Sequence, residues 1–296
     1  MNQKINSLYE DFRRGSTSRR DFLRKLTLYA GSAAAATALL PLLEDRSALA
    51  GAPPISPVSP GHSVPKGNTS LVTEFITYPG ETGEMKAFLA RPKKKKKYPA
   101  VIVIHEIFGL NTHIQDVTQR FAREGFLAIA PDALSQSGGT PADGSQAVTT
   151  IRELDPEKTT KNFVAAVRYL KTHPLSTGKV GCTGFCWGGG MTNQVAVHEP
   201  TLDAAVPYYG ATPAPEDVAK IKAPIMAHDA GDDARINQGI PAFEEALKKA
   251  GIEYKIFIYE GAKHGFNNDS APERYNEQAA KLAWERTIGF FKEKLG

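Results

Sequence analysis

The sequence has very little cysteine: two of its 296 residues, Cys182 and Cys186. Two cysteines four positions apart do not provide a disulfide framework, so we expect the fold to be held by a hydrophobic core. The chain is 41% hydrophobic, and it is long enough for one large α/β domain with a substantial core, or for two small domains. Internal repeats are also lacking, which argues against a repeat architecture.

An excess of one charge sign is lacking once the first fifty residues are set aside. The whole chain has 36 Lys and Arg against 32 Asp and Glu, and residues 1–50 hold eight and five of these, which leaves 28 against 27, or +1. We therefore expect no nucleic-acid partner. The five lysines of residues 93–97 lie between Pro92 and Pro99. They indicate a solvated turn between strands, with binding to a polyanion or a membrane surface as the alternative.

A metal-binding motif is lacking as well. His105 and Glu106 begin like the H-E-x-x-H zinc motif, but Gly109 stands where the second histidine is needed. The segment also follows an expected strand, whereas that motif requires a helix. We expect no metal and no cofactor.

No uninterrupted apolar run is long enough to make a convincing membrane span, because the run at residues 26–43 is rich in alanine and contains Gly31 and Pro41. The segment before it, with Arg19 and Arg20, resembles the twin-arginine export signal. A small-residue cleavage site fits residues 48–50. The resemblance implies that the twin-arginine machinery exports the folded protein to the periplasm or beyond, with residues 1–50 as the signal. The alternative is a membrane tether, if the segment is not removed.

The remaining chain reads as a linker followed by one domain. Residues 51–70 are rich in proline and serine, which indicates an extended linker. Residues 71–296 alternate short apolar runs with helical patterns. The expected strands are residues 71–78, 84–90, 100–104, 126–130, 179–183, 202–208, 223–227 and 254–259. The expected helices are residues 112–124, 156–172, 191–197, 241–250 and one within 270–294.

This alternation predicts an α/β fold, with a mostly parallel central sheet and helices on both of its faces. The first two expected strands, joined by Pro79 and Gly80, indicate an antiparallel pair at one edge. Residues 136–145 are rich in glycine and serine, and we expect them to form a loop that borders the active site.

One short segment carries the strongest chemical signal. Gly184, Cys186 and Gly188 form the G-x-S-x-G nucleophile elbow with cysteine in place of serine, between an expected strand and an expected helix. The positive end of a helix dipole favours the thiolate form of a cysteine, which is the nucleophilic form. The alternative is a tight turn that carries a small, buried and inert cysteine.

A cysteine nucleophile needs a base and an acid that orients the base. Sites in parallel sheets lie at the carboxyl ends of the strands, and Asp233 and His264 both follow expected strands. The chain order Cys186, Asp233, His264 is the nucleophile, acid, histidine order of α/β hydrolases. The competing candidates are His105 and His228 for the base, and Asp229 and Asp232 for the acid.

Five segments together resemble the dienelactone hydrolase family, over roughly residues 71–296. They are residues 105–109 (HEIFG), 184–189 (GFCWGG), 208–210 (YYG), 233–237 (DARIN) and 264–266 (HGF). The resemblance implies an α/β-hydrolase fold. It also implies hydrolysis of a small-molecule ester or lactone through an acyl-thiol intermediate.

The resemblance also implies residue roles. Cys186 is the nucleophile, His264 the general base and then acid, and Asp233 the residue that orients His264. Glu106 matches a glutamate that holds the resting thiol and takes part in its activation.

The remaining implied roles concern the substrate. The backbone N–H groups of Ile107 and Trp187 match the oxyanion hole, and Tyr209 matches a residue that lines the substrate pocket. Dienelactone hydrolases hold a substrate carboxylate with arginines, but no arginine follows His264 until Arg274. The lactone substrate is therefore less firmly implied than the mechanism. The alternatives are a thioester or small-amide hydrolase of the same mechanism, and a redox-responsive or binding protein on a hydrolase scaffold.

Overall fold

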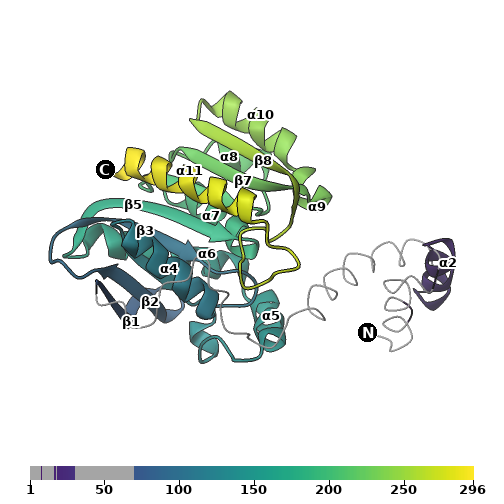
Figure 1. The fold of residues 1–296 in the computed structure, drawn as a ribbon, viewed down its shortest axis with the longest axis horizontal. Helices are drawn as coiled ribbons and strands as arrows, with labels where there is room; N and C mark the ends of the chain where they lie inside the picture. Colours follow the sequence, from purple (N-terminus) through teal and green to yellow (C-terminus); the bar gives the residue numbers. More distant parts are fainter. Residues whose placement is uncertain (1–7, 9–16, 18, 31–69) are drawn as a thin grey trace. The chain divides into compact units, whose positions relative to one another are not determined.

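The structure is a computed structural model that describes residues 8, 17, 19–30 and 70–296 (Figure 1). The chain divides into two units, Met1–Ile55 and Ser56–Gly296, and each is described by itself.

In the first unit, helix α2 (Arg19–Ala30) contains the paired arginines of the predicted export signal. Phe22 and Leu26 are buried one turn apart on this helix. Within the described residues, no helix has both the length and the apolar character needed to span a bilayer. The predicted cleavage site at residues 48–50 and residues 51–69 of the predicted linker lie outside the described residues. Export and the segment boundaries stay predictions.

The second unit is built on an eight-stranded sheet with the order β1-β2-β4-β3-β5-β6-β7-β8. The strands from β4 to β8 in this order are parallel to one another, whereas β1 pairs with β2, and β2 with β4, in antiparallel fashion. The mostly parallel sheet and the antiparallel edge pair are both confirmed. The strands are β1 (Leu71–Gly80), β2 (Gly83–Pro92), β3 (Tyr98–Ile104), β4 (Leu127–Pro131), β5 (Ser176–Phe185), β6 (Ala204–Tyr208), β7 (Ile225–Asp232) and β8 (Tyr254–Lys263).

Helices cover both faces of the sheet, as predicted. Helices α6, α7 and α10 supply buried side chains to a cluster on one face, and α4 and α11 supply those on the other (Figure 1). The helices of this unit are α4 (Thr112–Arg123), α5 (Gly144–Glu153), α6 (Pro156–Thr172), α7 (Trp187–His198), α8 (Pro215–Val218), α9 (Ala234–Asn237), α10 (Ile240–Ala250) and α11 (Glu277–Leu295), with a 3-10 turn η1 (Ser135–Ser137).

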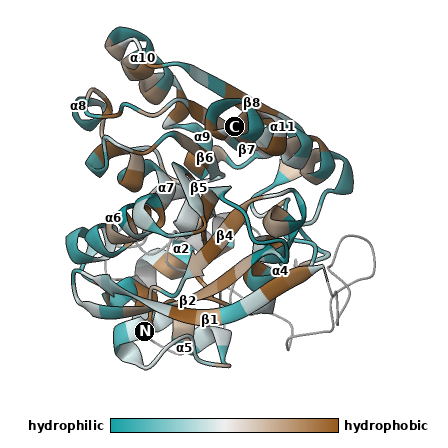
Figure 2. Cartoon of the chain, turned by 90° about the vertical axis from the view of Figure 1, so that its left-hand side faces the viewer, coloured by the Kyte–Doolittle hydropathy of each residue, from teal (hydrophilic) through white to brown (hydrophobic). Residues whose placement is uncertain are grey.

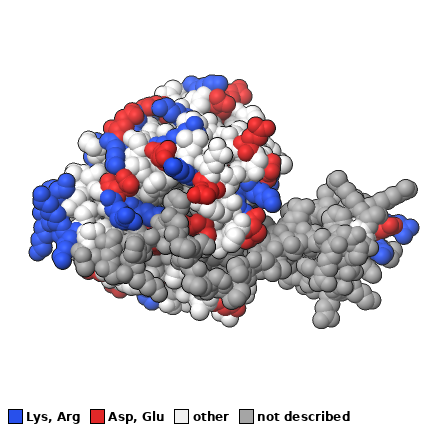
Figure 3. Space-filling view, in the orientation of Figure 1, with Lys and Arg blue, Asp and Glu red and all other residues white. Residues whose placement is uncertain are grey.

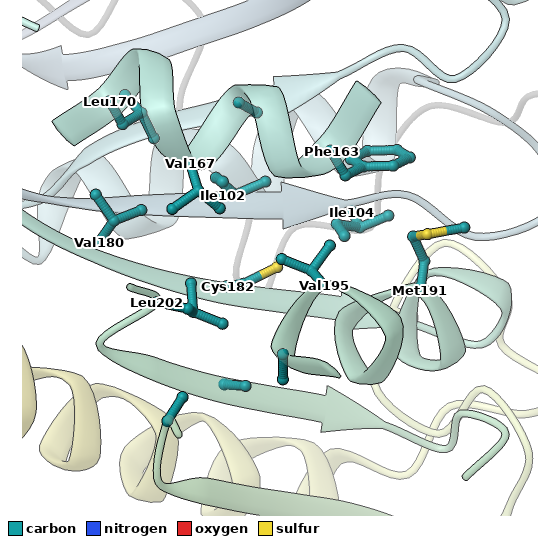
Figure 4. Close-up of a cluster of buried hydrophobic side chains, with 14 of the residues drawn as sticks. Ile102, Ile104, Phe163, Val167, Leu170, Val180, Cys182, Met191, Val195 and Leu202 are labelled. Atoms are coloured by element: carbon teal, nitrogen blue, oxygen red, sulfur yellow. The ribbon is translucent and has the colours of Figure 1, made fainter. Parts of the chain in front are cut away.

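Strand β3 shows why the central strands are apolar at every position. Ile102 and Ile104 pack into one cluster, while Val101 and Val103 pack into the other. In Figure 4, Ile102 and Ile104 lie beneath Phe163 and other α6 side chains, and Figure 2 shows hydrophobic residues along the central strands. Full burial of one such side chain contributes about 1.5–3 kcal/mol, so this core holds the carboxyl ends of the strands in fixed positions.

Local sequence signals set several helix ends. Helix α6 begins at Pro156, and the preceding Asp155 side chain accepts a hydrogen bond from the Lys158 N–H at 2.9 Å. Helix α10 ends at Gly251, whose φ of 68° is left-handed. Both ends agree with the prediction.

Helix α5 corrects the sequence analysis, which assigned no element to residues 146–155 and placed residues 144–145 in a loop. Asp143 caps this helix by accepting from the Ser145 N–H at 2.8 Å, and Ala147 and Ile151 bury one face. The helix was missed because a single cap and one apolar turn are weak signals beside a Gly/Ser-rich segment. The rest of the predicted loop, up to Asp143, contains only the short turn η1.

On the face shown in Figure 3, charged side chains of both signs are interspersed, apart from a group of Lys and Arg at the left edge. The five lysines of residues 93–97 follow β2 and are exposed, as expected of a solvated turn between strands.

Candidate active site

Four predicted segments meet at the carboxyl edge of the parallel strands. Cys186 directly follows β5, Asp233 directly follows β7 and His264 directly follows β8. His105 and Glu106 directly follow β3, which lies next to β5 in the sheet. The topology therefore brings together the residues that the sequence analysis selected.

Cys186 sits at a strained turn between β5 and α7. Its φ of 55° and ψ of −115° lie outside the regions that L-residues normally occupy. The Cys186 N–H donates to the Tyr208 carbonyl at 3.1 Å, and the Cys186 carbonyl accepts from the Gly189 N–H at 3.0 Å. These bonds hold the backbone in the geometry of a nucleophile elbow, with the thiol at the N-terminus of α7.

The two glycines of the elbow are required by close packing. A Cβ on Gly184 would collide with the Gly188 carbonyl, and a Cβ on Gly188 would collide with the carbonyls of Ile104 and His105. The elbow thus lies directly against the end of β3, which places the segment from His105 onward beside Cys186.

The imidazole of His264 joins the thiol to a carboxylate. Its Nδ1 lies 2.5 Å from the Asp233 Oδ2, and Cys186 acts on the same ring. Because Nδ1 is engaged by Asp233, Nε2 is the nitrogen left for Cys186. Asp233 is buried and Asp232 is exposed, so the structure places Asp233 and not Asp232 against the histidine.

Charge in this trio favours an imidazolium. Burial lowers the pKa of His264, but the negative charge of Cys186 and the hydrogen bonds to Asp233 and Cys186 outweigh burial and raise that pKa to about 10. Burial raises the pKa of Asp233, but its hydrogen bond and attraction to His264 bring the pKa below its ordinary value. The surroundings of His264 therefore favour its imidazolium form beside the Asp233 carboxylate.

The competing histidine and aspartate have other surroundings. His228 is buried, with Nδ1 2.9 Å from the Tyr259 Oη and Nε2 3.1 Å from the Thr287 Oγ1. Burial and the nearby Arg286 lower its pKa to about 3, so this ring is neutral and fully engaged. Burial and the charge of Asp233 raise the pKa of Asp229 to about 7.

Glu106 is buried and held by a residue that the sequence analysis missed. The Asn268 Nδ2 donates to the Glu106 Oε2 at 2.6 Å, and the Asn268 Oδ1 accepts from the N–H and Oγ of Ser270. The only available signal was a polar residue in the loop after His264, where the sequence analysis looked for an arginine.

Tyr209 lies beside the trio in a strained conformation, with a φ of 36°. Its N–H donates to the His228 carbonyl at 2.8 Å, and its ring meets that of His264 edge-on at 5.1 Å. The hydroxyl is buried and has no hydrogen-bond partner within the described chain. Burial, followed by the charges of Glu106 and Cys186, raises its pKa well above the ordinary value.

The two predicted oxyanion donors lie in the segments that follow β5 and β3. The N–H of Trp187 begins α7 directly after Cys186, and the N–H of Ile107 belongs to the segment that follows β3. Among residues 70–296, neither N–H donates to a protein acceptor. Free donors at a helix N-terminus suit an anionic oxygen.

Comparison with known proteins agrees with this geometry. Residues 85–295 match the dienelactone hydrolase family. The chain belongs to the dienelactone hydrolase family. Its α/β-hydrolase fold and its membership make it a hydrolase.

The matches to known proteins extend over nearly the whole length of those proteins. The chain is 33% identical over 261 residues to an Escherichia coli (strain K12) protein provisionally named a carboxymethylenebutenolidase, covering 83% of this chain and 95% of the relative. A Saccharolobus solfataricus protein with the same provisional name is 32% identical over 255 residues, covering 73% and 97%. A crystal structure from Klebsiella pneumoniae, provisionally called a dienelactone hydrolase, superposes with a TM-score of 0.69 at 28% identity, covering 76% of this chain and 99% of that one.

One arginine of this dienelactone hydrolase family member lies near the site. Its Arg274 Nη1 is 3.4 Å from the position that a Gly265 Cβ would take, and its charge acts on Tyr209. The sequence analysis could name Arg274 but could not place it, because the loop of residues 264–276 carries no periodic pattern.

The loop that carries His264 is anchored by a buried ionic cluster. Asp269 Oδ2 lies 2.6 Å from the Arg120 Nη2, and its Oδ1 lies 3.2 Å from the His113 Nδ1. Arg120 also bonds Asp116 through Nε at 2.7 Å. Three of these residues belong to α4, so the cluster ties the histidine loop to a helix of the core.

We expect Asp269→Asn to destabilise the enzyme at pH 7. Burial alone would raise the pKa of Asp269, but the contacts with His113 and Arg120 lower it to about 2. A depressed carboxyl pKa stabilises the fold above the unfolded value of about 4 and ceases to do so as pH falls towards 2. The loss at pH 7 is on the order of 2 kcal/mol.

Urea denaturation of the wild-type and Asp269→Asn enzymes measures this loss of stability. The stability difference between them should shrink between pH 4 and pH 2. Equal stabilities at pH 7 would show that the cluster does not anchor the loop.

Proposed function

We propose that this enzyme hydrolyses a small-molecule ester or lactone through the thiol of Cys186. The observation that carries the proposal is the hydrogen bond between His264 and Asp233, with Cys186 acting on the same imidazole from a strained elbow. A positioned base beside a nucleophile, with a carboxylate behind the base, is the arrangement required for acyl transfer.

In the acylation step, the Cys186 thiolate attacks the substrate carbonyl carbon and a C–S bond forms. The carbonyl π electrons move to the oxygen, which the N–H groups of Ile107 and Trp187 stabilise. When the oxyanion collapses, the C–O bond to the leaving alcohol breaks. The His264 imidazolium donates its proton to the departing oxygen, and a thioester of Cys186 remains.

In the deacylation step, water attacks the thioester carbonyl while neutral His264 takes the proton of that water. The second oxyanion occupies the same pair of donors. Its collapse breaks the C–S bond, releases a carboxylic acid and restores the thiolate and imidazolium. Asp233 keeps the ring oriented through both steps, and Tyr209 borders the reacting atoms.

Glu106 is proposed to take part in activating the thiol, because its carboxyl group is buried and because Glu106 and Cys186 both act electrostatically on the Tyr209 hydroxyl. We expect Glu106→Gln to change the pH profile of Cys186 alkylation, because the variant removes an ionisable carboxyl group from the site of the thiol. Iodoacetamide labelling across pH 4–10 measures the profile, with Glu260→Gln as an exposed control. Superimposable profiles would remove Glu106 from the activation mechanism.

The proposed function is tested by assaying the enzyme with p-nitrophenyl acetate and a dienelactone, and by following the mass of Cys186. We expect turnover and a transient acetyl group on Cys186. Turnover of the lactone supports the family activity. Turnover of the ester but not of the lactone redirects the search for the substrate, and thioesters and small amides would then be assayed. A thiol that oxidises but is never acylated contradicts the proposal and favours the redox-responsive or binding alternative.

We also propose that the enzyme acts after export by the twin-arginine machinery. The proposal is supported by the paired Arg19 and Arg20, followed by an alanine-rich run and a small-residue site. Fractionation of a bacterial host should find the mature protein in the periplasm, and Arg19→Lys with Arg20→Lys should retain it in the cytoplasm. Export that persists in this double variant would contradict the proposed route.

A further inference from the structure

His105 was a candidate base in the sequence, but backbone groups engage both of its ring nitrogens. The ring is completely buried. Nδ1 lies 2.6 Å from the Glu106 carbonyl oxygen, and Nε2 lies 3.1 Å from the Ala133 N–H. The ring therefore links the segment after β3 to the segment after β4.

The two contacts determine where the ring carries its proton. The Ala133 backbone N–H can only donate, so Nε2 must accept and carries no hydrogen. The neutral ring then has its hydrogen on Nδ1, from which it donates to the Glu106 carbonyl. Burial lowers the pKa of His105, although the bond to Glu106 opposes this, so the ring is neutral at pH 7.

The carbonyl that His105 holds belongs to the same peptide unit as an oxyanion donor. A peptide unit is planar, so fixing the Glu106 oxygen also fixes the direction of the Ile107 N–H. The Gly109 N–H donates to the same oxygen at 3.1 Å. Two donors thus set the plane of this peptide.

The same ring also contacts the other side of the oxyanion hole. It stacks on the Trp187 indole with centroids 5.3 Å apart and planes 13° apart, and the Trp187 N–H is the second proposed donor. Gly188 packs against the His105 carbonyl so closely that a Cβ would collide. The His105 imidazole therefore contacts both residues that position the donors, Glu106 through its carbonyl and Trp187 through its indole.

We infer that His105 is the positioning residue of the oxyanion hole, holding the Glu106–Ile107 peptide so that its N–H faces the developing oxyanion. This inference rests on the proposed function. It assigns the ring no proton transfer, because backbone groups engage both of its nitrogens. Removing one oxyanion donor costs about a hundredfold to a thousandfold in rate, and misdirecting one should cost on the order of tenfold to a hundredfold.

Two substitutions separate the two contacts of the ring. The amide nitrogen of His105→Asn replaces Nδ1 and keeps the bond to the Glu106 carbonyl. The amide oxygen of His105→Gln replaces Nε2 and keeps the bond from Ala133, but it loses the donor to Glu106. We expect His105→Gln to lose tenfold to a hundredfold in the rate of Cys186 acylation by p-nitrophenyl acetate, and His105→Asn to stay within about fivefold of wild type.

Alkylation by iodoacetamide provides the readout that separates positioning from general damage. It displaces iodide from a saturated carbon and forms no oxyanion, so both variants should alkylate at the wild-type rate. Equal acylation by wild type and His105→Gln would overturn the inference, as would a parallel loss of acylation and alkylation in both variants. A wild-type enzyme that is never acylated at Cys186 would instead refute the proposed function, on which the inference rests.

Nitrogen NMR of the wild-type imidazole tests the inference without a substitution, which matters if a variant at this buried position fails to fold. We expect His105 to stay neutral, with its hydrogen on Nδ1, from pH 8 down to pH 7. A ring protonated on Nε2 in this range would overturn the inference, because that ring could not donate to the Glu106 carbonyl and accept from Ala133.

Discussion

Cys186→Ala is expected to reduce kcat/KM for p-nitrophenyl acetate by at least about 10⁴-fold, because the variant lacks the thiol that forms the proposed covalent intermediate. The residual rate would come from the oxyanion donors and from substrate binding alone. The variant should fold normally, since the elbow conformation is held by backbone hydrogen bonds to Tyr208 and Gly189. Steady-state kinetics and a thermal melt measure the two effects.

Cys182 provides the matched control. It is fully buried four residues before the nucleophile, and burial raises the pKa of its thiol to about 12, so it is not a nucleophile at neutral pH. Cys182→Ala should keep kcat/KM within a few-fold, and iodoacetamide should then still label one site. If Cys186→Ala retained the wild-type rate, the cysteine mechanism would be refuted.

The sequence predicted the fold well because its strongest signals are local. Apolar runs such as residues 100–104 need burial on both faces, and only a covered parallel sheet provides this. The proximity of Cys186, Asp233 and His264 followed from one topological rule, because residues that directly follow parallel strands share one edge. Neither inference required knowledge of side-chain contacts.

The contacts that refine the site could not be predicted in this way. Asn268 bonds Glu106 across 162 positions of the chain, and no periodic pattern records such a pair. His105 was indistinguishable from a candidate base, because its role depends on the backbone of Ala133, which reaches it from another loop. These pairings arise only when irregular loops are placed by the folded core.

Asp233→Asn is expected to reduce kcat/KM for a lactone or alkyl ester on the order of 10³-fold to 10⁴-fold. An amide cannot stabilise the imidazolium of His264, and it does not fix the tautomer of the neutral ring. Burial lowers the pKa of His264, and the charges of Cys186 and Asp233 together raise it to about 10. Without the Asp233 charge, the lowering of the His264 pKa by burial is opposed less strongly, so the imidazolium loses its proton at lower pH. The alkaline limb of the pH profile should therefore move to lower pH.

This shift should depend on the leaving group. An alkoxide needs the proton of His264 to depart, whereas p-nitrophenolate does not, so the alkaline limb should be steep for an alkyl ester and shallow for p-nitrophenyl acetate. Asp232→Asn is the matched control, because this neighbouring carboxylate is exposed and should leave both profiles unchanged. An Asp233→Asn enzyme with the wild-type alkaline limb would show that His264 does not deliver the proton to the leaving group. The acid of the acylation step would then have to be sought elsewhere, and the buried Tyr209 hydroxyl, whose ring contacts His264, would be the first candidate.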